Sequence, residues 1–436
     1  MRLELANFTV RDVQFGNETR YNNGRLEINK KELIALILED KKIASADIDV
    51  AFPNEETRIV NIRDVVDPRI KVSGPGCVFP GILGLPETVG EGTTHKLSGV
   101  TVMVSARYRP TILSGTAAQM SGLVDMWGPG ARATPFGSTI NIVPVIKLID
   151  DISEPEAHTV IQLAGFKVAH RLAETTRNTT PESIEIFELF KVDPSLPRVV
   201  YILGLYTEWH VVHSLVAYYG MSIRESLATF IHPNELLDGA LTPDARRGSG
   251  IMPRTWSYTN HPVVLRLLRE HGKRLNFLGV ILQRTRFEWD LGKQITAAGT
   301  SQMARLLGAD GAIITRTVTS GNNFIDTMLT VQACERKGIK TVFMTPEWGG
   351  KDGFELPLVF YVPEATAILS TGSFEHEIKL PAPTKVIGVE DKTQLVTYQP
   401  LDQPYSPWDE FSPREWSRIT NGIDWWGGMN LTCKTY

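Results

Sequence analysis

From Arg198 onward, short apolar runs alternate with segments of helical periodicity, and this order constrains the fold more than any other feature. Strands buried on both faces have continuous apolar runs, and such strands alternating with helices are typical of a parallel sheet covered by helices. We therefore expect a Rossmann-like, doubly wound α/β domain over residues 198–380, without the Gly-x-Gly-x-x-Gly dinucleotide motif. The expected strands are Val199–Leu205, Leu227–Ile231, Phe277–Leu282, Gly311–Thr315, Thr341–Met344 and Ala365–Leu369; the expected helices are Glu208–Tyr218, Val263–His271, Gly292–Leu307 and Asn323–Lys337.

The first 150 residues have a different pattern, in which short alternating runs are separated by turn signals. Alternation of apolar and polar residues is typical of strands with one buried face. We expect an N-terminal β-rich domain over residues 1–150. Its expected strands are Arg2–Phe8, Arg25–Ile28, Ile43–Val50, Arg58–Val66 and Ile70–Val72, and its expected helix is Lys30–Asp40.

Two further segments flank the expected α/β domain. Residues 151–197 are predicted to be a helical connector, because Ser153–Asn178 has an apolar stripe at helical spacing. Residues 381–436 are predicted to be a C-terminal extension with one short strand at Lys385–Gly388. Its apolar tail, Asp424–Asn430, is expected to dock on the body of the protein or on a partner.

Composition excludes several classes of protein. At 436 residues the chain is long enough for two domains. A net charge of -4 gives no reason to expect nucleic acid or an anionic membrane as partner, and the sequence contains no apolar run long enough to span a bilayer. Three widely spaced cysteines exclude a disulfide framework and fit a cytoplasmic protein.

Basic and amide side chains follow the expected strands at the edge where doubly wound sheets bind ligands. Arg284 and Arg286 follow one strand, and Arg316 follows another. Guanidinium groups pair bidentately with carboxylates. Asn322 and Asn323 open the next helix, where backbone N–H groups favour anions. We predict that these five residues bind a substrate carboxylate or another anion; solvated surface arginines are the alternative.

Glu347, just after the Thr341–Met344 strand, is the first candidate for acid/base catalysis or for contact with a substrate ammonium group. The alternative is a carboxylate that only caps a turn. Asp352, in the following glycine-rich stretch, and Thr371, after the last strand, are predicted to complete the substrate pocket.

Glu208, His210 and His213 form a second candidate group after the first expected strand. If Thr207 caps the helix, the two histidines are three residues apart on one helical face. The group would then act as catalytic acid and base or hold a divalent metal, although its spacing is not an established zinc motif. A histidine buried in the core with a satisfied ring is the alternative for His213.

The stretch 237–262 has almost no apolar periodicity and interrupts the expected α/β domain. With its flanks, Leu237-Asp238-Gly239-Ala240 and Asn260-His261-Pro262, it resembles the component B alpha/beta proproteins of glycine, sarcosine and betaine reductases. The resemblance runs from Met1 to about Gly388 and is strongest over Phe277–Gly353, which includes Glu347 and Asp352.

In that family a cysteine in this loop cleaves its own chain and leaves a pyruvoyl group on the new N-terminus. Counted from either flank, the family's Asn-Cys pair falls on Ala245-Arg246, and Cys77, Cys334 and Cys433 all lie outside the loop. Pyruvoyl is therefore not expected here. Ser249 is the only serine between Ala240 and Pro253, and serine is a pyruvoyl precursor in unrelated enzymes.

The resemblance implies a hetero-oligomeric complex with a second reductase-type subunit that carries a redox thiol or selenol, acting on a small amino compound. We therefore expect a subunit of a complex that cleaves a C–N or related bond without a pyruvoyl group of its own. One alternative is a subunit of a non-redox, metal-dependent C–N hydrolase or lyase. A second is a non-catalytic scaffold for a catalytic partner.

Overall fold

A computed structural model describes residues 1–107, 122–207, 216–224, 226–243, 252–317, 321–347, 358–373, 378–388, 406–410 and 419–429. Within these ranges the chain has the mixed α/β composition that the patterns predict, with its strands distributed over several sheets. The alternation of strands and helices after Arg198 is present, and the earlier part is rich in strands.

A six-stranded sheet dominates the described residues after Arg198. Its strands are β13 (Arg198–Tyr206), β16 (Ala228–Ile231), β18 (Asn276–Thr285), β19 (Gly311–Arg316), β20 (Lys340–Glu347) and β21 (Ile368–Ser373), in the order β16-β18-β13-β19-β20-β21. All neighbours pair in parallel except β16, which runs antiparallel to β18. The carboxyl ends of the parallel strands therefore lie along one edge of the sheet.

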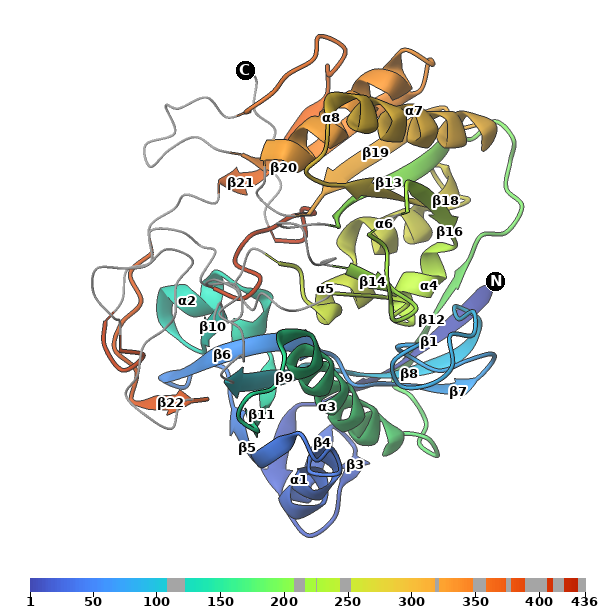
Figure 1. Ribbon diagram of the computed structural model, residues 1–436. Helices are drawn as coiled ribbons and strands as arrows, with labels where there is room; N and C mark the ends of the chain where they lie inside the picture. Colours follow the sequence, from blue (N-terminus) through green and yellow to red (C-terminus); the bar gives the residue numbers. More distant parts are fainter. Residues whose placement is uncertain are drawn as a thin grey trace.

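Helices cover this sheet on both faces because successive side chains of a strand point to opposite sides. The helices are α4 (Pro233–Leu237), α6 (Pro262–Glu270), α7 (Asp290–Leu306) and α8 (Gly321–Glu335). Val200 and Ile202 of β13 belong to the same core as residues of α7 and α8, whereas Tyr201 and Leu203 share a core with α4 and α6. In Figure 1, α7 and α8 lie at the top, and α4 and α6 lie between this sheet and the β-rich part below.

The β-rich part contains two larger sheets. The first has the order β12-β1-β8-β7 and comprises β1 (Arg2–Thr9), β7 (Arg69–Ser73), β8 (Gly92–Ser98) and β12 (Ser183–Glu188). The second has the order β10-β6-β9-β11-β5 and comprises β5 (Ile43–Ala51), β6 (Thr57–Val66), β9 (Val100–Arg107), β10 (Gly122–Asp125) and β11 (Ile140–Leu148). A small sheet contains β2 (Asp12–Phe15), β3 (Arg20–Asn22) and β4 (Arg25–Ile28).

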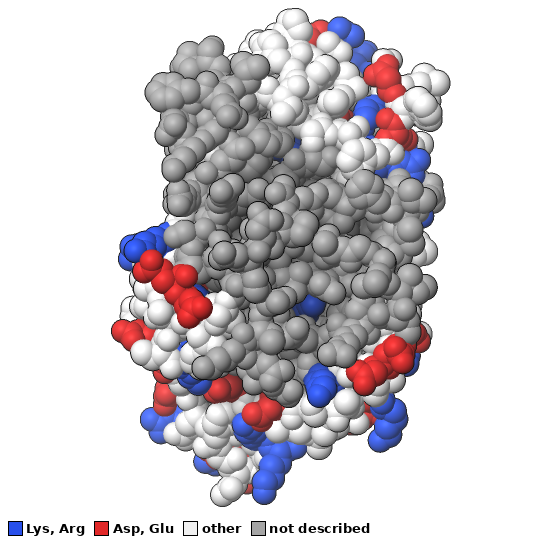
Figure 2. Space-filling view, turned by 60° about the vertical axis from the view of Figure 1, so that its left-hand side comes forward, with Lys and Arg blue, Asp and Glu red and all other residues white. Residues whose placement is uncertain are grey.

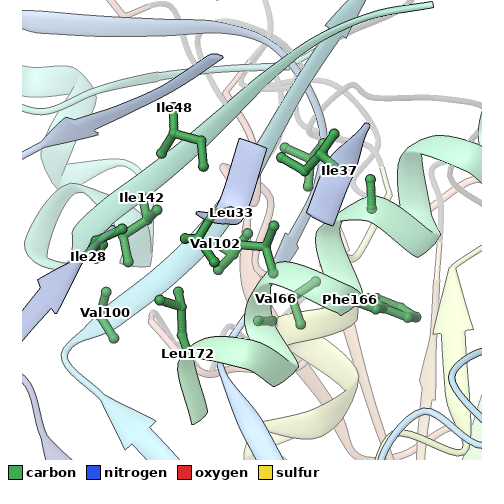
Figure 3. Close-up of a cluster of buried hydrophobic side chains, with 14 of the residues drawn as sticks. Ile28, Leu33, Ile37, Ile48, Val66, Val100, Val102, Ile142, Phe166 and Leu172 are labelled. Carbon is green, nitrogen blue, oxygen red and sulfur yellow. The ribbon is translucent and has the colours of Figure 1, made fainter. Parts of the chain in front are cut away.

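The core of this part lies between the second sheet and two helices, α1 (Lys30–Ile37) and α3 (Glu154–Glu174). Figure 3 shows Val102 and Ile142 from the sheet facing Phe166 and Leu172 from α3. Each of these side chains is at most 1% exposed. Burying one such side chain contributes about 1.5–3 kcal/mol to the free energy of unfolding. This core therefore contributes much of the stability of the β-rich part.

The stretch 237–262 is not irregular throughout. It includes β17 (Leu241–Pro243) and α5 (Thr255–Thr259), and α6 begins at its end; residues 244–251 lie outside the described ranges. β17 pairs antiparallel with β14 (Val216–Tyr218), which also pairs with β15 (Met221–Ser222). The prediction of a helix over Glu208–Tyr218 is therefore wrong at its last three residues, because pairing with a distant strand overrides the local pattern.

Three other expectations change in detail. β16 is an antiparallel edge strand, so the apolar run before the loop is not a parallel strand. β22 (Lys385–Ile387), expected as one more strand, joins β6 in the β-rich part. Residues 151–197 contain β12 as well as α3, and β12 pairs with β1. The domain boundaries themselves stay a prediction.

Four buried charged residues of β6 and β7 and their connection hold the stretch 237–262 against the β-rich part. This flank cluster consists of Asp64, Asp67, Arg69 and Lys71. On the first flank, Lys71 forms an ion pair with Asp238, whose other oxygen accepts a hydrogen bond from Thr94 at 2.6 Å. Arg69 donates to the carbonyl oxygen of Leu237.

The second flank is held by the same cluster. Asp64 accepts hydrogen bonds from the backbone N–H of Thr255 at 3.0 Å and from its hydroxyl at 2.6 Å. Asp67 accepts from the hydroxyl of Thr259 at 2.9 Å, and Arg69 donates to the carbonyl oxygen of Thr259 at 3.0 Å. The described segments before residue 244 and after residue 251 are thus both held by buried charges that are paired or hydrogen-bonded, as buried charges must be.

None of the described helices is long and apolar enough to cross a membrane. Figure 2 shows basic and acidic side chains interspersed over the described part of one face, without a broad region of one sign. That distribution agrees with the small net charge of -4.

Replacing Asp67 by Asn should destabilise the protein by about 3–5 kcal/mol at neutral pH, because it leaves Arg69 buried without its carboxylate. Burial raises the pKa of Asp67, but the charges of Arg69 and Lys96 outweigh burial and hold the pKa well below 3.8. A lowered folded pKa stabilises above the unfolded pKa, and this contribution is lost as the pH falls. The difference between wild type and Asp67→Asn should therefore shrink below about pH 4.

Urea unfolding of both proteins across pH measures this difference. Asp47→Asn is the matched control, because the Asp47–Lys30 ion pair at 2.6 Å is largely exposed and should contribute less than about 1 kcal/mol. Equal small losses for the two variants would contradict the role given to the flank cluster.

Candidate functional site

The carboxyl ends of β19, β20 and β21 bring four of the predicted site residues to one edge of the sheet. Arg316 ends β19, Glu347 ends β20, and Thr371 lies near the end of β21. Asn323 stands in the first turn of α8, which follows β19. All four side chains are at most 4% exposed, so a ligand that reached them would be removed from bulk water.

Arg316 is a buried cation at this edge. Its Nε donates to the hydroxyl of Thr345 at 2.9 Å, and a terminal nitrogen donates to Oδ1 of Asn323 at 3.1 Å. Its guanidinium carbon lies 4.9 Å from the ring centre of Phe324 and 5.6 Å from that of Trp425. Burial lowers the pKa of Arg316 to about 9, so the group stays positive at neutral pH.

Glu347 and Thr371 come from neighbouring strands beside Arg316. β20 and β21 are paired, with Glu347 opposite Ser373 and Thr345 opposite Ser370. Among the described residues the buried hydroxyl of Thr371 has no hydrogen-bond partner. Such a group costs free energy in the folded protein, and its hydroxyl keeps the capacity to hydrogen-bond a molecule that enters the site.

The other two predicted arginines lie elsewhere on the edge. Arg284 and Arg286 belong to the end of β18, and β13 separates β18 from β19. Both pair with the carboxylate of Glu288, at 3.1 Å and 3.3 Å respectively. The predicted cluster of three arginines is therefore divided between two places on the edge, with Arg284 and Arg286 beside Glu288 and with Arg316 at the end of β19.

Asn322 does not share the environment of Asn323. Its backbone carbonyl accepts a hydrogen bond from Lys293 at 3.2 Å, and Lys293 also forms an ion pair with Asp326 at 2.9 Å. Glu208, His210, His213 and Asp352 lie outside the described residues. Within the described part of the chain, no three His, Cys, Asp or Glu residues group closely enough to hold a metal ion.

A pocket that the sequence patterns did not predict lies next to this edge. The tryptophan pocket, as we call it, has a cavity volume of about 160 Å³ and is lined by residues from 135, 253–262 and 421–429. Its walls include Trp256, Asn260, Asn421, Asp424, Trp425 and Trp426. Trp425 contacts Arg316 and also lines the pocket, so it joins the two features.

The C-terminal tail builds one wall of the pocket by docking on the body of the protein, as predicted for its apolar residues. Trp425 and Trp426 are each 4% exposed and belong to the core shared by β13 and α6. The ring of Trp426 stacks on His261 with a centroid distance of 4.0 Å. The hydroxyl of Thr134 donates to the carbonyl oxygen of Thr420 at 2.7 Å, which ties the tail to the β-rich part.

Comparison with known proteins places the chain in a family. Residues 1–398 match the family of glycine/sarcosine/betaine reductase component B subunits. The chain belongs to this family. It is 35% identical over 394 residues to the glycine reductase complex component B subunits alpha and beta of Acetoanaerobium sticklandii, with 89% of each chain covered.

Two relatives from Peptoclostridium acidaminophilum are similarly close. The sarcosine reductase complex component B subunit alpha is 33% identical over 406 residues, which cover 91% of each chain. The betaine reductase complex component B subunit alpha is 34% identical over 398 residues, covering 89% of this chain and 88% of the relative. No solved structure matches. The resemblance inferred from the residues is confirmed, and the tail that builds the tryptophan pocket lies beyond the matched residues 1–398.

Replacing Thr371 by Val should affect the stability of the protein and the binding of its substrate differently. The change removes a buried hydroxyl without a partner in the described structure, so stability should stay equal or rise by about 1 kcal/mol. If the hydroxyl meets the substrate, KM of the complex containing this variant should rise about tenfold. Thermal unfolding and steady-state kinetics measure the two effects.

Thr300→Val is the matched control, because the Thr300 hydroxyl in α7 is also buried without a partner among the described residues. It should change stability in the same direction and leave KM unchanged. If the Thr371→Val variant has an unchanged KM, Thr371 does not contact the substrate.

Proposed function

We propose that this chain is a subunit of a reductase complex that cleaves a C–N or related bond of a small amino compound, without a pyruvoyl group of its own. Family membership over residues 1–398 supports the reductase complex. The observation that carries the second part is Ala245-Arg246 at the position of the family's Asn-Cys pair. The names of the relatives support glycine or its N-methylated derivatives as the class of substrate.

Cys77 and Cys334 are not suitable precursors of a pyruvoyl group. A pyruvoyl group forms from the residue at the cut itself, so its precursor must belong to the cleaved backbone. Cys77 is half-buried on the connection between β7 and β8, where burial and the charge of Asp238 raise the pKa of its thiol. Cys334 is buried in α8, and burial raises the pKa of its thiol to about 12. Neither belongs to the stretch 237–262.

The substrate site in this proposal is the edge formed by β19, β20 and β21. The five parallel strands have chain order 2-1-3-4-5 across the sheet, one of the orders of doubly wound, Rossmann-like domains. In that order the binding crevice lies where connections leave a central strand in opposite directions, here between β13 and β19. Arg316 ends β19 at this point.

Each residue at the edge has a role that follows from its chemistry. Arg316, held by Thr345 and Asn323, keeps its positive charge in a dry site and attracts the substrate carboxylate. Glu347 contacts the substrate ammonium group and takes up or returns its proton. The hydroxyl of Thr371 makes a further hydrogen bond to the substrate, which would satisfy its unpaired oxygen.

The electrons in this proposal come from a partner subunit. A reductive cleavage of a C–N bond consumes two electrons. In this proposal a redox thiol or selenol on the partner, together with a second thiol, supplies them by becoming a disulfide or a selenenyl sulfide. The carbon gains a hydrogen in place of the amine, and the amine leaves with the other proton. The relatives are components of multi-subunit complexes, which supports a hetero-oligomer. With only three cysteines in the chain, a cytoplasmic location is the natural setting for such thiol chemistry.

The purified complex tests this function directly. Turnover should require a thiol reductant, persist in a metal chelator, and fall by about 10²–10⁴ when Glu347 is replaced by Gln. Glu364→Gln is the matched control, because Glu364 pairs with Arg336 at 2.8 Å near the surface, away from the edge. Turnover without any reductant, or its loss on chelation, would point to hydrolysis and overturn the reductive proposal.

A further inference from the structure

We propose that two copies of this chain pair through helix α7, with the two helices antiparallel and a two-fold axis near Ala298 and Gly299. The proposal goes beyond the proposed function and does not depend on it. In Figure 1, α7 lies on the outer side of the parallel sheet, away from the β-rich part. The α7 face, as we call this surface, comprises the exposed residues Trp289, Leu291, Ile295, Ala298, Gly299 and Leu306.

Large apolar side chains lie exposed along one stripe of α7. Leu291 is 68% exposed, Ile295 is 50% exposed and Leu306 is 78% exposed. They follow one another at intervals of four and eleven residues, close to one and three helical turns, so they share a side of the helix. Ala297 and Ala304 on the opposite side are buried. A helix that is apolar on both sides is typical of a helix that is covered on both sides.

Trp289 stands at the N-terminal end of this helix. Its side chain is 89% exposed, whereas tryptophan is highly buried on average in folded proteins. It occupies the N-cap position, where it makes no capping hydrogen bond and where Ser, Thr, Asp or Asn would stabilise the helix. Neither the core nor the start of the helix explains a tryptophan here. A contact with another chain does, because tryptophan is enriched at the centres of protein interfaces.

The middle of the α7 face is formed by small residues. Ala298 and Gly299 lie between Ile295 and Leu306, and a Cβ atom added to Gly299 would meet nothing within 4 Å. Glycine inside a helix is destabilising relative to alanine, and the described structure of one copy contains no contact that requires it. A second helix gives a reason for it, because small side chains at a crossing point let two helix axes approach closely.

The polar residues beside the stripe fit a second copy that runs in the opposite direction. In a two-fold antiparallel pair, residues at equal distances on either side of the axis meet. Gln294 and Gln302 lie equally far from Ala298, and Asp290 and Arg305 do so to within one residue. Asp290 of each copy therefore meets Arg305 of the other. A parallel pair would instead place like charges side by side, which selects the antiparallel arrangement.

Both charges are available for this contact. Asp290 accepts a hydrogen bond from the side-chain amide of Gln294 at 2.6 Å, and this neutral donor leaves its charge in place. Within the described ranges neither Asp290 nor Arg305 forms an ion pair. The α7 face is thus complementary to itself in charge as well as in shape.

The area of the α7 face predicts a weak dimer. From their exposed fractions, its four large side chains present roughly 400 Å². Two copies with their polar flanks would bury about 1,000 Å², which is at the low end of specific interfaces. We therefore expect a dissociation constant of about 1–100 µM for the isolated chain.

Sedimentation velocity of the full chain from about 1 to 200 µM tests the pairing. The mass should rise with concentration from the 48.5 kDa of one copy toward twice that value. Leu291→Asp and Gly299→Glu should each weaken pairing at least about tenfold, because each would bury a carboxylate in the interface. Gly299→Glu should not lower the melting temperature, because the site is open and glutamate favours helix. Leu85→Asp is the control, because Leu85 is 82% exposed on the connection between β7 and β8.

Charge reversal tests the direction of the two helices. Asp290→Arg or Arg305→Asp alone should weaken pairing by about threefold or more, because each places like charges together at both ends of the pair. An equimolar mixture of these two variants should pair at least as tightly as wild type, because opposite charges then meet at both ends. If the mixture pairs no better than either variant alone, the antiparallel arrangement is wrong.

Three further results would overturn the proposal. One is a single copy at every concentration, and another is a dimer that Leu291→Asp and Gly299→Glu leave intact. The third is a chain that stays monomeric while Leu291→Asp prevents assembly of the complex, which would assign the α7 face to a different subunit. None of these measurements involves turnover, so the reductant dependence of the complex tests the proposed function separately.

Discussion

The buried contacts between the flank cluster and the stretch 237–262 are the interaction on which the remaining structure depends. Lys71 pairs with Asp238, and Asp67 accepts a hydrogen bond from Thr259, where the β-rich part meets the segment that leads into the parallel sheet. Removing such charges from water is costly unless each is paired and hydrogen-bonded. The described parts of the stretch therefore stay where these charges are compensated, with Thr255 and Thr259 of α5 bonded to the flank cluster.

That position also determines the candidate site. α5 carries Trp256, and His261 at the start of α6 stacks on Trp426. The docked tail then brings Trp425 against Arg316 at the carboxyl end of β19. A segment held by the β-rich part, a strand end of the parallel sheet and the tail thus meet at one place, where a buried cation and an aromatic pocket adjoin.

Local patterns in the sequence were sufficient for the elements with strong periodicity. The strands β13, β18, β19 and β20 are buried on both faces, so their apolar runs identified them and placed Arg316 and Glu347 at strand ends. Contacts between distant segments could not be predicted in this way. β14 forms a strand because it pairs with β17, and nothing in its own residues distinguishes it from the end of a helix.

The candidate site was predictable to the same extent. The rule that ligands bind at the carboxyl ends of parallel strands predicted Arg316, Asn323, Glu347 and Thr371. It could not predict that Arg284 and Arg286 pair with Glu288, because that pairing depends on side-chain geometry that sequence spacing does not specify. The tryptophan pocket was missed because Trp256 and Trp425 are far apart in the chain. The apolar tail was a signal that it docks, but it did not reveal which residues it would meet.

The central claim is that this member of the component B family works without cleaving its own chain. Because the flank cluster holds both sides of residues 244–251, two fragments would stay together under native conditions, so the mass must be measured after denaturation. Intact-mass spectrometry of the denatured protein should give one species near 48.5 kDa. Two separate fragments whose masses place the cleavage near Ser249, one of them with a carbonyl group at its N-terminus, would contradict the account. They would show that this chain forms a pyruvoyl group.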